Sequence, residues 1–218
     1  MGTQPFAGGL AIEVQMTPSS VDSTPTLTGW ARRDAVLYGV AIVLLQLCDY
    51  WQAAGSFWLA DLVAPLVGFI VAYGLCYVNH EWGHYWGARW AGARLPLGPY
   101  RGVLLGLFDP RQHSRRQFQA MSLGGVVGYV FTAGVVLSIF SLSAGTIIWG
   151  GLALGGVAFV VQSLSVDGPI IWRVHRGADV IVTAREGAAP AVILRRTWQS
   201  WSLLALLIGL TYALGALD

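Results

Sequence analysis

Two histidines and a glutamate near the middle of the chain have the spacing of a metal-binding helix. The segment His80-Glu81-Trp82-Gly83-His84 reads H-E-x-x-H. Residues four apart lie on one face of a helix, so both imidazoles can bind the same ion. Glu81 falls on the same turn, where its carboxylate can accept a proton from a water on that ion, as in zinc-dependent proteases. The spacing predicts His80 and His84 as ligands of Zn²⁺ and Glu81 as the catalytic base.

The composition places this motif in a membrane protein. Of the 218 residues, 55% are hydrophobic and only 11% are charged, whereas soluble domains carry roughly 25% charged residues. The mean hydropathy is +0.59. Ionisable side chains inside an apolar helix are costly in lipid and usually serve function. The composition therefore predicts that the chain lies in a lipid bilayer, and it excludes an ordinary soluble enzyme. It gives no sign of nucleic-acid binding.

Five apolar stretches are long enough to cross a bilayer, which takes about 20 residues per helix. The sequence predicts an all-α polytopic membrane protein with about five transmembrane helices. Residues 1–34 are expected to be an N-terminal cytoplasmic lead-in, and residues 35–218 a single transmembrane domain. The predicted spans cover about 35–53, 57 or 62 to 90, 118–142, 145–164 and 198–217.

The basic residues predict the orientation of these spans. All thirteen are arginines, and they lie before the first span, between the second and third, and between the fourth and fifth. Cytoplasmic loops of membrane proteins are enriched in basic residues. The N-terminus is therefore expected in the cytoplasm and the C-terminus outside. A chain that uses arginine and no lysine suggests a GC-rich bacterial genome, and hence the bacterial inner (cytoplasmic) membrane.

Two further segments have patterns of their own. Residues 94–108 are apolar but interrupted by Gly and Pro, which predicts a re-entrant or β-hairpin-like membrane-associated segment between the second and third spans. The glycines of the third and fourth spans predict close helix packing. They are Gly124, Gly125, Gly128, Gly150, Gly151, Gly155 and Gly156.

A third metal ligand is expected from the end of the fourth span. Asp167-Gly168-Pro169 follows that span, which runs in the same direction as the second. Both polar sites therefore reach a similar membrane depth, although 83 positions separate His84 from Asp167. The alternative for Asp167 is a turn that simply ends the helix.

Residues 62–173 resemble the site-2 protease family of intramembrane zinc metalloproteases. The stretch from His80 to Arg89 is similar to the metal helix of that family, and Asp167-Gly168 matches the Asp-Gly whose aspartate is its third zinc ligand. The resemblance implies that His80, His84 and Asp167 bind Zn²⁺. It also implies an endopeptidase that cleaves a transmembrane protein substrate near the cytoplasmic leaflet.

The chain departs from the family pattern where substrate is handled. Family members carry Asn and prolines just before the Asp-Gly, whereas residues 159–166 contain neither. Gln162 is predicted to contact substrate in place of the missing Asn. Asn79 is predicted to hydrogen-bond to substrate or to a metal ligand, and the alternative for it is helix capping or packing. A second hypothesis is therefore a catalytically inactive accessory or structural subunit of a larger membrane protein complex. A di-iron enzyme would need more than the four histidines present.

Overall fold

The fold is all-α, and four of its helices are long and apolar enough to cross a membrane. The computed structural model describes residues 24–55, 58–102, 104–142, 147–187 and 189–215. The four candidate spans are α1 (Leu27–Ala53), α2 (Trp58–Trp90), α3 (Arg115–Leu142) and α4 (Ile147–Val166). The remaining helices are α5 (Gly168–His175), α6 (Val180–Gly187) and α7 (Pro190–Gly215). The predicted all-α integral membrane protein is thereby confirmed.

The helix boundaries differ from the predicted spans mainly at the two ends of the chain. Helix α1 begins at Leu27 because the Thr26 hydroxyl accepts the Gly29 N–H and caps the first turn. The predicted fifth span falls largely within α7, which is not among the four candidate spans of the described residues. The short helices α5 and α6 were not predicted, since eight residues are too few for a clear periodic pattern.

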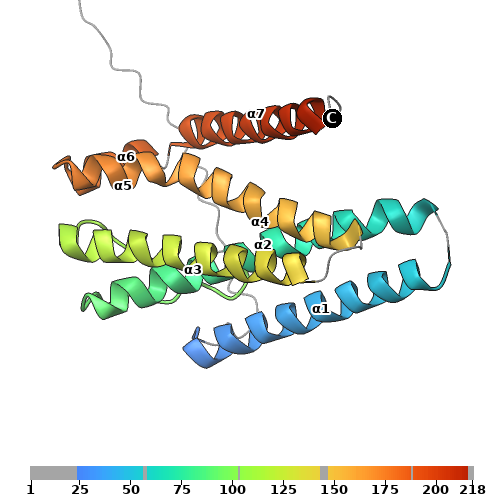
Figure 1. Ribbon diagram of the computed structural model, residues 1–218. Helices are drawn as coiled ribbons and strands as arrows, with labels where there is room; N and C mark the ends of the chain where they lie inside the picture. Colours follow the sequence, from blue (N-terminus) through green and yellow to red (C-terminus); the bar gives the residue numbers. More distant parts are fainter. Residues whose placement is uncertain (1–23, 56–57, 103, 143–146, 188, 216–218) are drawn as a thin grey trace, which may run out of the picture.

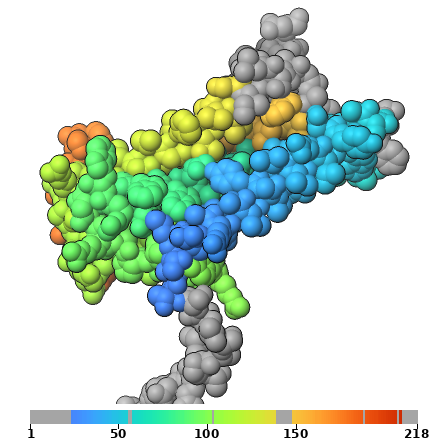
Figure 2. Space-filling view, turned by 90° about the horizontal axis from the view of Figure 1, so that it is seen from below, coloured from blue at the N-terminus to red at the C-terminus, as the bar shows by residue number. Residues whose placement is uncertain are grey.

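Helix α2 is the central element, and it contacts α1, α3 and α4. The helices lie side by side, with α1 along one outer side and α7 beyond α4 on the other (Figure 1). Figure 2 shows α1 in blue along the surface, with its N-terminal end beside the green segment that follows α2. The outer side of α1 exposes Val36, Val40, Val43 and Leu47, as expected of a helix that faces lipid.

Glycines allow α2 to approach α3 and α4 closely, which confirms most of the predicted glycine contacts. A Cβ on Gly124 would lie 2.2 Å from the Gly83 carbonyl oxygen of α2. On α4, a Cβ on Gly151 would lie 2.0 Å from the Pro65 carbonyl oxygen. Gly150 is an exception, since no atom lies within 4 Å of a Cβ built there. Backbone-to-backbone packing of this kind is the usual source of helix association in lipid.

The segment between α2 and α3 folds back on itself. Leu97 and Gly106 form an antiparallel bridge, and the Gly98 N–H donates to the Leu105 carbonyl at 3.0 Å. The described residues of this segment contain no longer strand. We call residues 97–106 the bridge loop. Its predicted insertion into the membrane remains a prediction.

Candidate metal centre

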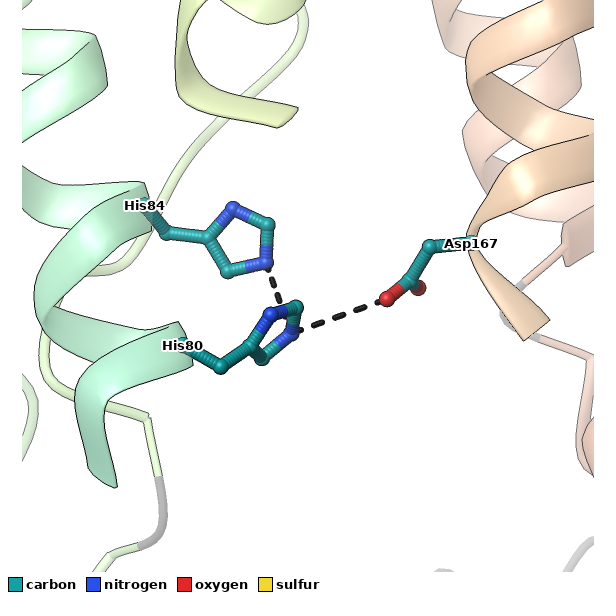
Figure 3. Close-up of side chains that lie close together, drawn as sticks. All are labelled: His80, His84 and Asp167. Carbon is teal, nitrogen blue, oxygen red and sulfur yellow. Dashed lines mark hydrogen bonds and ion pairs between the residues drawn. The ribbon is translucent and has the colours of Figure 1, made fainter. Parts of the chain in front are cut away.

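The fold brings three predicted ligands together from two distant parts of the chain. His80 and His84 extend from α2, and Asp167 lies between α4 and α5. One candidate ligand atom from each residue lies within 4.8 Å of the other two. The His80 and His84 Nε2 atoms are 2.9 Å apart, and the Asp167 Oδ2 is 3.6 Å from the His80 Nε2 (Figure 3). The cluster is a candidate metal centre built from the residues that the sequence singled out.

Two of the three ligand-to-ligand separations are close to those around one zinc ion, and all three lie within 4.8 Å. Zinc binds histidine nitrogen at about 2.0–2.1 Å and carboxylate oxygen at about 2.0–2.2 Å, so two ligands of a tetrahedral site lie about 3.4 Å apart. The observed separations of 2.9 and 3.6 Å fall on either side of that value. Two neutral imidazoles and one carboxylate are also a donor set that zinc accepts.

A backbone hydrogen bond fixes the direction of the His84 ring. Its Nδ1 lies 2.9 Å from the Met121 carbonyl oxygen of α3. A carbonyl oxygen only accepts, so Nδ1 carries the proton and Nε2 keeps its lone pair. Such a bond on the far ring nitrogen is typical of metal-binding histidines. The lone pair of His84 is therefore directed towards His80.

Aromatic packing and the contact of its Nε2 with His84 hold the His80 ring. The residue is only 8% exposed, and its ring centroid lies 5.6 Å from that of Tyr129 and 5.7 Å from that of Phe159. Its Nδ1 has no hydrogen-bond partner among the described residues. Because the His84 Nε2 is the acceptor in the contact between the two rings, the His80 Nε2 carries the proton. A bound cation would replace that proton.

Asp167 is oriented by a serine that sequence reasoning missed. The Ser163 hydroxyl donates to the Asp167 Oδ2 at 3.0 Å. Ser163 precedes Asp167 by four positions, so the two side chains lie on one face where α4 ends. The spacing of four positions could have predicted this hydrogen bond once Asp167 was taken as a ligand. Beside it, an Arg196 Nη1 from α7 donates to the Val166 carbonyl at 2.8 Å.

Replacing Ser163 with alanine is expected to weaken metal binding about tenfold, because hydrogen bonds that orient ligands typically contribute at this level. Ser165→Ala is the matched control, since its hydroxyl bonds only to the Val161 carbonyl one turn back. Zinc affinity is measured by competition with a chromogenic chelator. Equal affinities of the two variants would contradict a role for Ser163 in orienting Asp167.

Glu81 is buried and held by the bridge loop. The residue is 9% exposed, and its Oε2 accepts the Leu105 N–H at 3.3 Å. The bridge loop therefore sets the position of the predicted catalytic base. The hydrogen bond from Leu105 to Glu81 was not predicted, because Leu105 is 24 positions further along the chain.

A buried carboxylate near the start of α1 pairs with its neighbour Arg33 and bonds this end of the helix to α2. Asp34 is 4% exposed, and its Oδ1 lies 2.6 Å from an Arg33 Nη2. The other carboxylate oxygen accepts the Trp82 indole N–H at 2.7 Å. Both oxygens of the buried carboxylate are thus satisfied, as a buried charge requires.

Side chains at the same end of α1 also donate hydrogen bonds to the bridge loop. An Arg33 Nη1 donates to the Gly102 carbonyl at 3.2 Å, and the Trp30 indole N–H donates to the Gly98 carbonyl at 2.9 Å. The Arg33 guanidinium lies over the Trp30 ring, 3.7 Å from its centroid. Arg33 therefore links α1 directly to the loop that contacts Glu81, and to α2 only through Asp34.

The Arg33→Gln variant is expected to unfold about 1–3 kcal/mol more easily, because it leaves the buried Asp34 carboxylate with one partner. Exchange of the Leu105 amide hydrogen should also become faster. Arg32→Gln is the control, since it removes the same charge from an exposed neighbour. Chemical unfolding in detergent and hydrogen exchange read by mass spectrometry give the two results. The same loss in both variants would show that charge, and not the linkage, is responsible.

Asn79 and Gln162 are already engaged with neighbouring helices. The Asn79 Nδ2 donates to the Thr132 Oγ1 of α3 at 2.8 Å. The Gln162 Oε1 accepts the Tyr73 hydroxyl of α2. These bonds connect α2 to α3 and to α4, and contact of either side chain with substrate stays a prediction.

A cavity of about 280 Å³ adjoins the cluster on the side of α5 and α6. His84 and Asp167 form part of its wall, and most of the remaining wall is apolar. The candidate metal centre therefore has space beside it. The other residues of the wall are Phe118, Met121, Ser122, Val166, Ile170, Ile171, Ala184, Gly187 and Ile193.

The chain was also compared with known proteins. No protein-family model, curated protein or solved structure matches it.

Proposed function

We propose that this membrane protein is an intramembrane zinc metalloendopeptidase of the site-2 protease type. The observation that carries the proposal is the convergence of His80, His84 and Asp167, with one candidate ligand atom of each within 4.8 Å of the others. An accidental cluster has no reason to include a glutamate on the same helical turn. Glu81 supplies that group, and a purely structural metal site does not need it.

The residues of the chain divide the chemistry between them. His80, His84 and Asp167 would hold the ion, and zinc bound there supplies a Lewis acid that brings the pKa of water towards about 7. Glu81 takes the proton of the attacking water and passes it to the amine that leaves. The Leu105 N–H holds the Glu81 carboxylate during that transfer.

The proposed substrate is a transmembrane helix that unwinds before it is cut. Helical carbonyls are hydrogen-bonded within the helix, so a scissile bond is reached only in an extended segment. The segment 94–108 offers a backbone edge to which an extended substrate can add by strand pairing. We place the N-terminus of the enzyme in the cytoplasm and the C-terminus outside, with α7 as a fifth span, in a bacterial inner membrane. The arginine distribution supports this orientation and cleavage near the cytoplasmic leaflet.

The test combines metal analysis with a cleavage assay. The full chain is purified without chelators in zinc-containing buffer, and metal content is read by mass spectrometry. It is then reconstituted with single-span peptides whose helices are weakened by Gly and Pro. We expect one zinc per chain and cleavage within the span that stops when a chelator removes the metal. Failure to hold stoichiometric zinc would refute the proposal.

A second candidate function is an inactive accessory subunit of a larger membrane complex. It is favoured by the hydrogen bonds that already occupy Asn79 and Gln162, the side chains expected to contact substrate. This alternative predicts that the chain copurifies with partner proteins. It also predicts no cleavage of any peptide in the panel, whether or not zinc is bound.

A further inference from the structure

A second cavity lies among α5, α6 and the start of α7, and its character differs from that of the metal centre. Its volume is about 300 Å³. Three arginines and a single carboxylate line it, which leaves an excess of two positive charges. The lining residues are Ile170, Arg173, Thr183, Glu186, Gly187, Val192, Arg195 and Arg196.

The three arginines differ in how many partners they have within the protein. Arg173 pairs with Glu186 at 2.7 Å, and Arg196 donates one N–H to the Val166 carbonyl. Arg195 has neither an ion pair nor a hydrogen bond among the described residues. Arg195 is exposed, so water can satisfy its N–H donors in the absence of a ligand. A guanidinium carries five N–H donors, so the three arginines together can donate to an acceptor beyond the one carboxylate and the one carbonyl already bound.

A buried threonine adds a donor without a partner. Thr183 is only 1% exposed and lines the same cavity. Its Oγ1 has no hydrogen-bond partner among the described residues. Buried hydroxyl groups are nearly always hydrogen-bonded, because leaving one unpaired is unfavourable. The Thr183 Oγ1 itself has almost no accessible surface, so a ligand in the cavity reaches this hydroxyl only if neighbouring side chains move.

We propose that this cavity binds a phosphate group. Phosphate oxygens accept hydrogen bonds only, and they match the fork of a guanidinium group. Arg195 and Arg196 supply the charge. A cavity of about 300 Å³ holds roughly ten water volumes, which is enough for a phosphate with a short substituent. The site adjoins the cavity beside the metal centre, with which it shares Ile170 and Gly187, but the proposal does not depend on the peptidase chemistry.

The phosphate has two sources that share this chemistry. The cavity lies just beyond the last residue of a candidate span, Val166, where the headgroups of anionic phospholipids lie. Trp172 of α5 and Trp198 of α7 are exposed, as is common at the membrane interface. A soluble phosphate compound can reach the same surface from the water side. The experiment distinguishes the two.

The test measures phosphate and lipid binding to the full chain in phosphatidylcholine nanodiscs. Inorganic phosphate is titrated at constant ionic strength, and retention of phosphatidylglycerol is read by native mass spectrometry. We expect Arg195→Gln to weaken binding about tenfold, because it removes a charge-assisted hydrogen bond. Arg185→Gln is the control, since it removes an exposed arginine of α6 that is not part of the cavity. Thr183→Val is a second control, since it keeps the shape of the side chain and removes a hydroxyl that is closed off from the cavity, and it should leave binding unchanged.

Either probe can support the site. Retention of phosphatidylglycerol without binding of inorganic phosphate supports a headgroup site, and the reverse result supports a soluble ligand. The proposal is overturned if neither probe binds. It is also overturned if Arg185→Gln weakens binding as much as Arg195→Gln, which would indicate a diffuse basic surface.

Discussion

Replacing Glu81 with glutamine is expected to abolish peptide cleavage while leaving zinc bound. Glutamine keeps the size of the side chain and can still accept the Leu105 N–H, but it cannot take a proton from water. General-base catalysis typically contributes about 10²–10⁴-fold to the rate, so kcat should fall by that factor. His80→Ala should instead lose both zinc and activity, because it removes a proposed ligand.

Metal content and cleavage rate are therefore measured on the same preparations. Asp49→Asn serves as the control, since it removes an exposed carboxylate from α1. Retained activity in Glu81→Gln would remove Glu81 from the mechanism and would leave the cluster as a metal site of another kind. Loss of zinc in Glu81→Gln would instead make Glu81 a ligand, contrary to the assignment of Asp167.

The Gly125→Ala variant is expected to weaken zinc binding about 10–100-fold, although Gly125 is not a ligand. A Cβ at this position would lie 2.4 Å from the His84 Cε1, 2.6 Å from its Nδ1 and 2.7 Å from its Nε2. The ring must move to make room, and it then loses the Met121 carbonyl that fixes its direction. One added methyl group on α3 thus disturbs a ligand on α2.

Gly134→Ala is the matched control for this variant. It makes the same change in the same helix, where no atom lies within 4 Å of the new Cβ. Zinc affinity and thermal stability of both variants are compared in one detergent. Unchanged zinc affinity in Gly125→Ala would mean that the His84 ring can shift without cost, and that its observed position does not matter for metal binding.

The sequence by itself determined the class of the protein and half of the candidate site. Apolar stretches of about 20 residues form helices in any bilayer, since their backbone groups have no other partners there. The spacing of His80 and His84 is a local property of one helix, so their shared face followed from the period of 3.6 residues. Asp167 followed in part, because the alternating direction of the spans brings its end of α4 to the same depth.

Tertiary structure decided everything that depends on contacts between distant segments. Whether Asp167 reaches His80 depends on how closely α2 and α4 pack, and that distance is set by glycines such as Gly151 against the Pro65 carbonyl. The Met121 carbonyl on His84 and the Leu105 amide on Glu81 are backbone groups, which no residue type reveals in a sequence. The arginine cavity likewise exists only because α5, α6 and α7 meet. Helical periodicity depends only on residues close together in the sequence, so it can be predicted from the sequence alone. The positions of the ligands, the base and the cavity depend on side-chain packing across the whole fold.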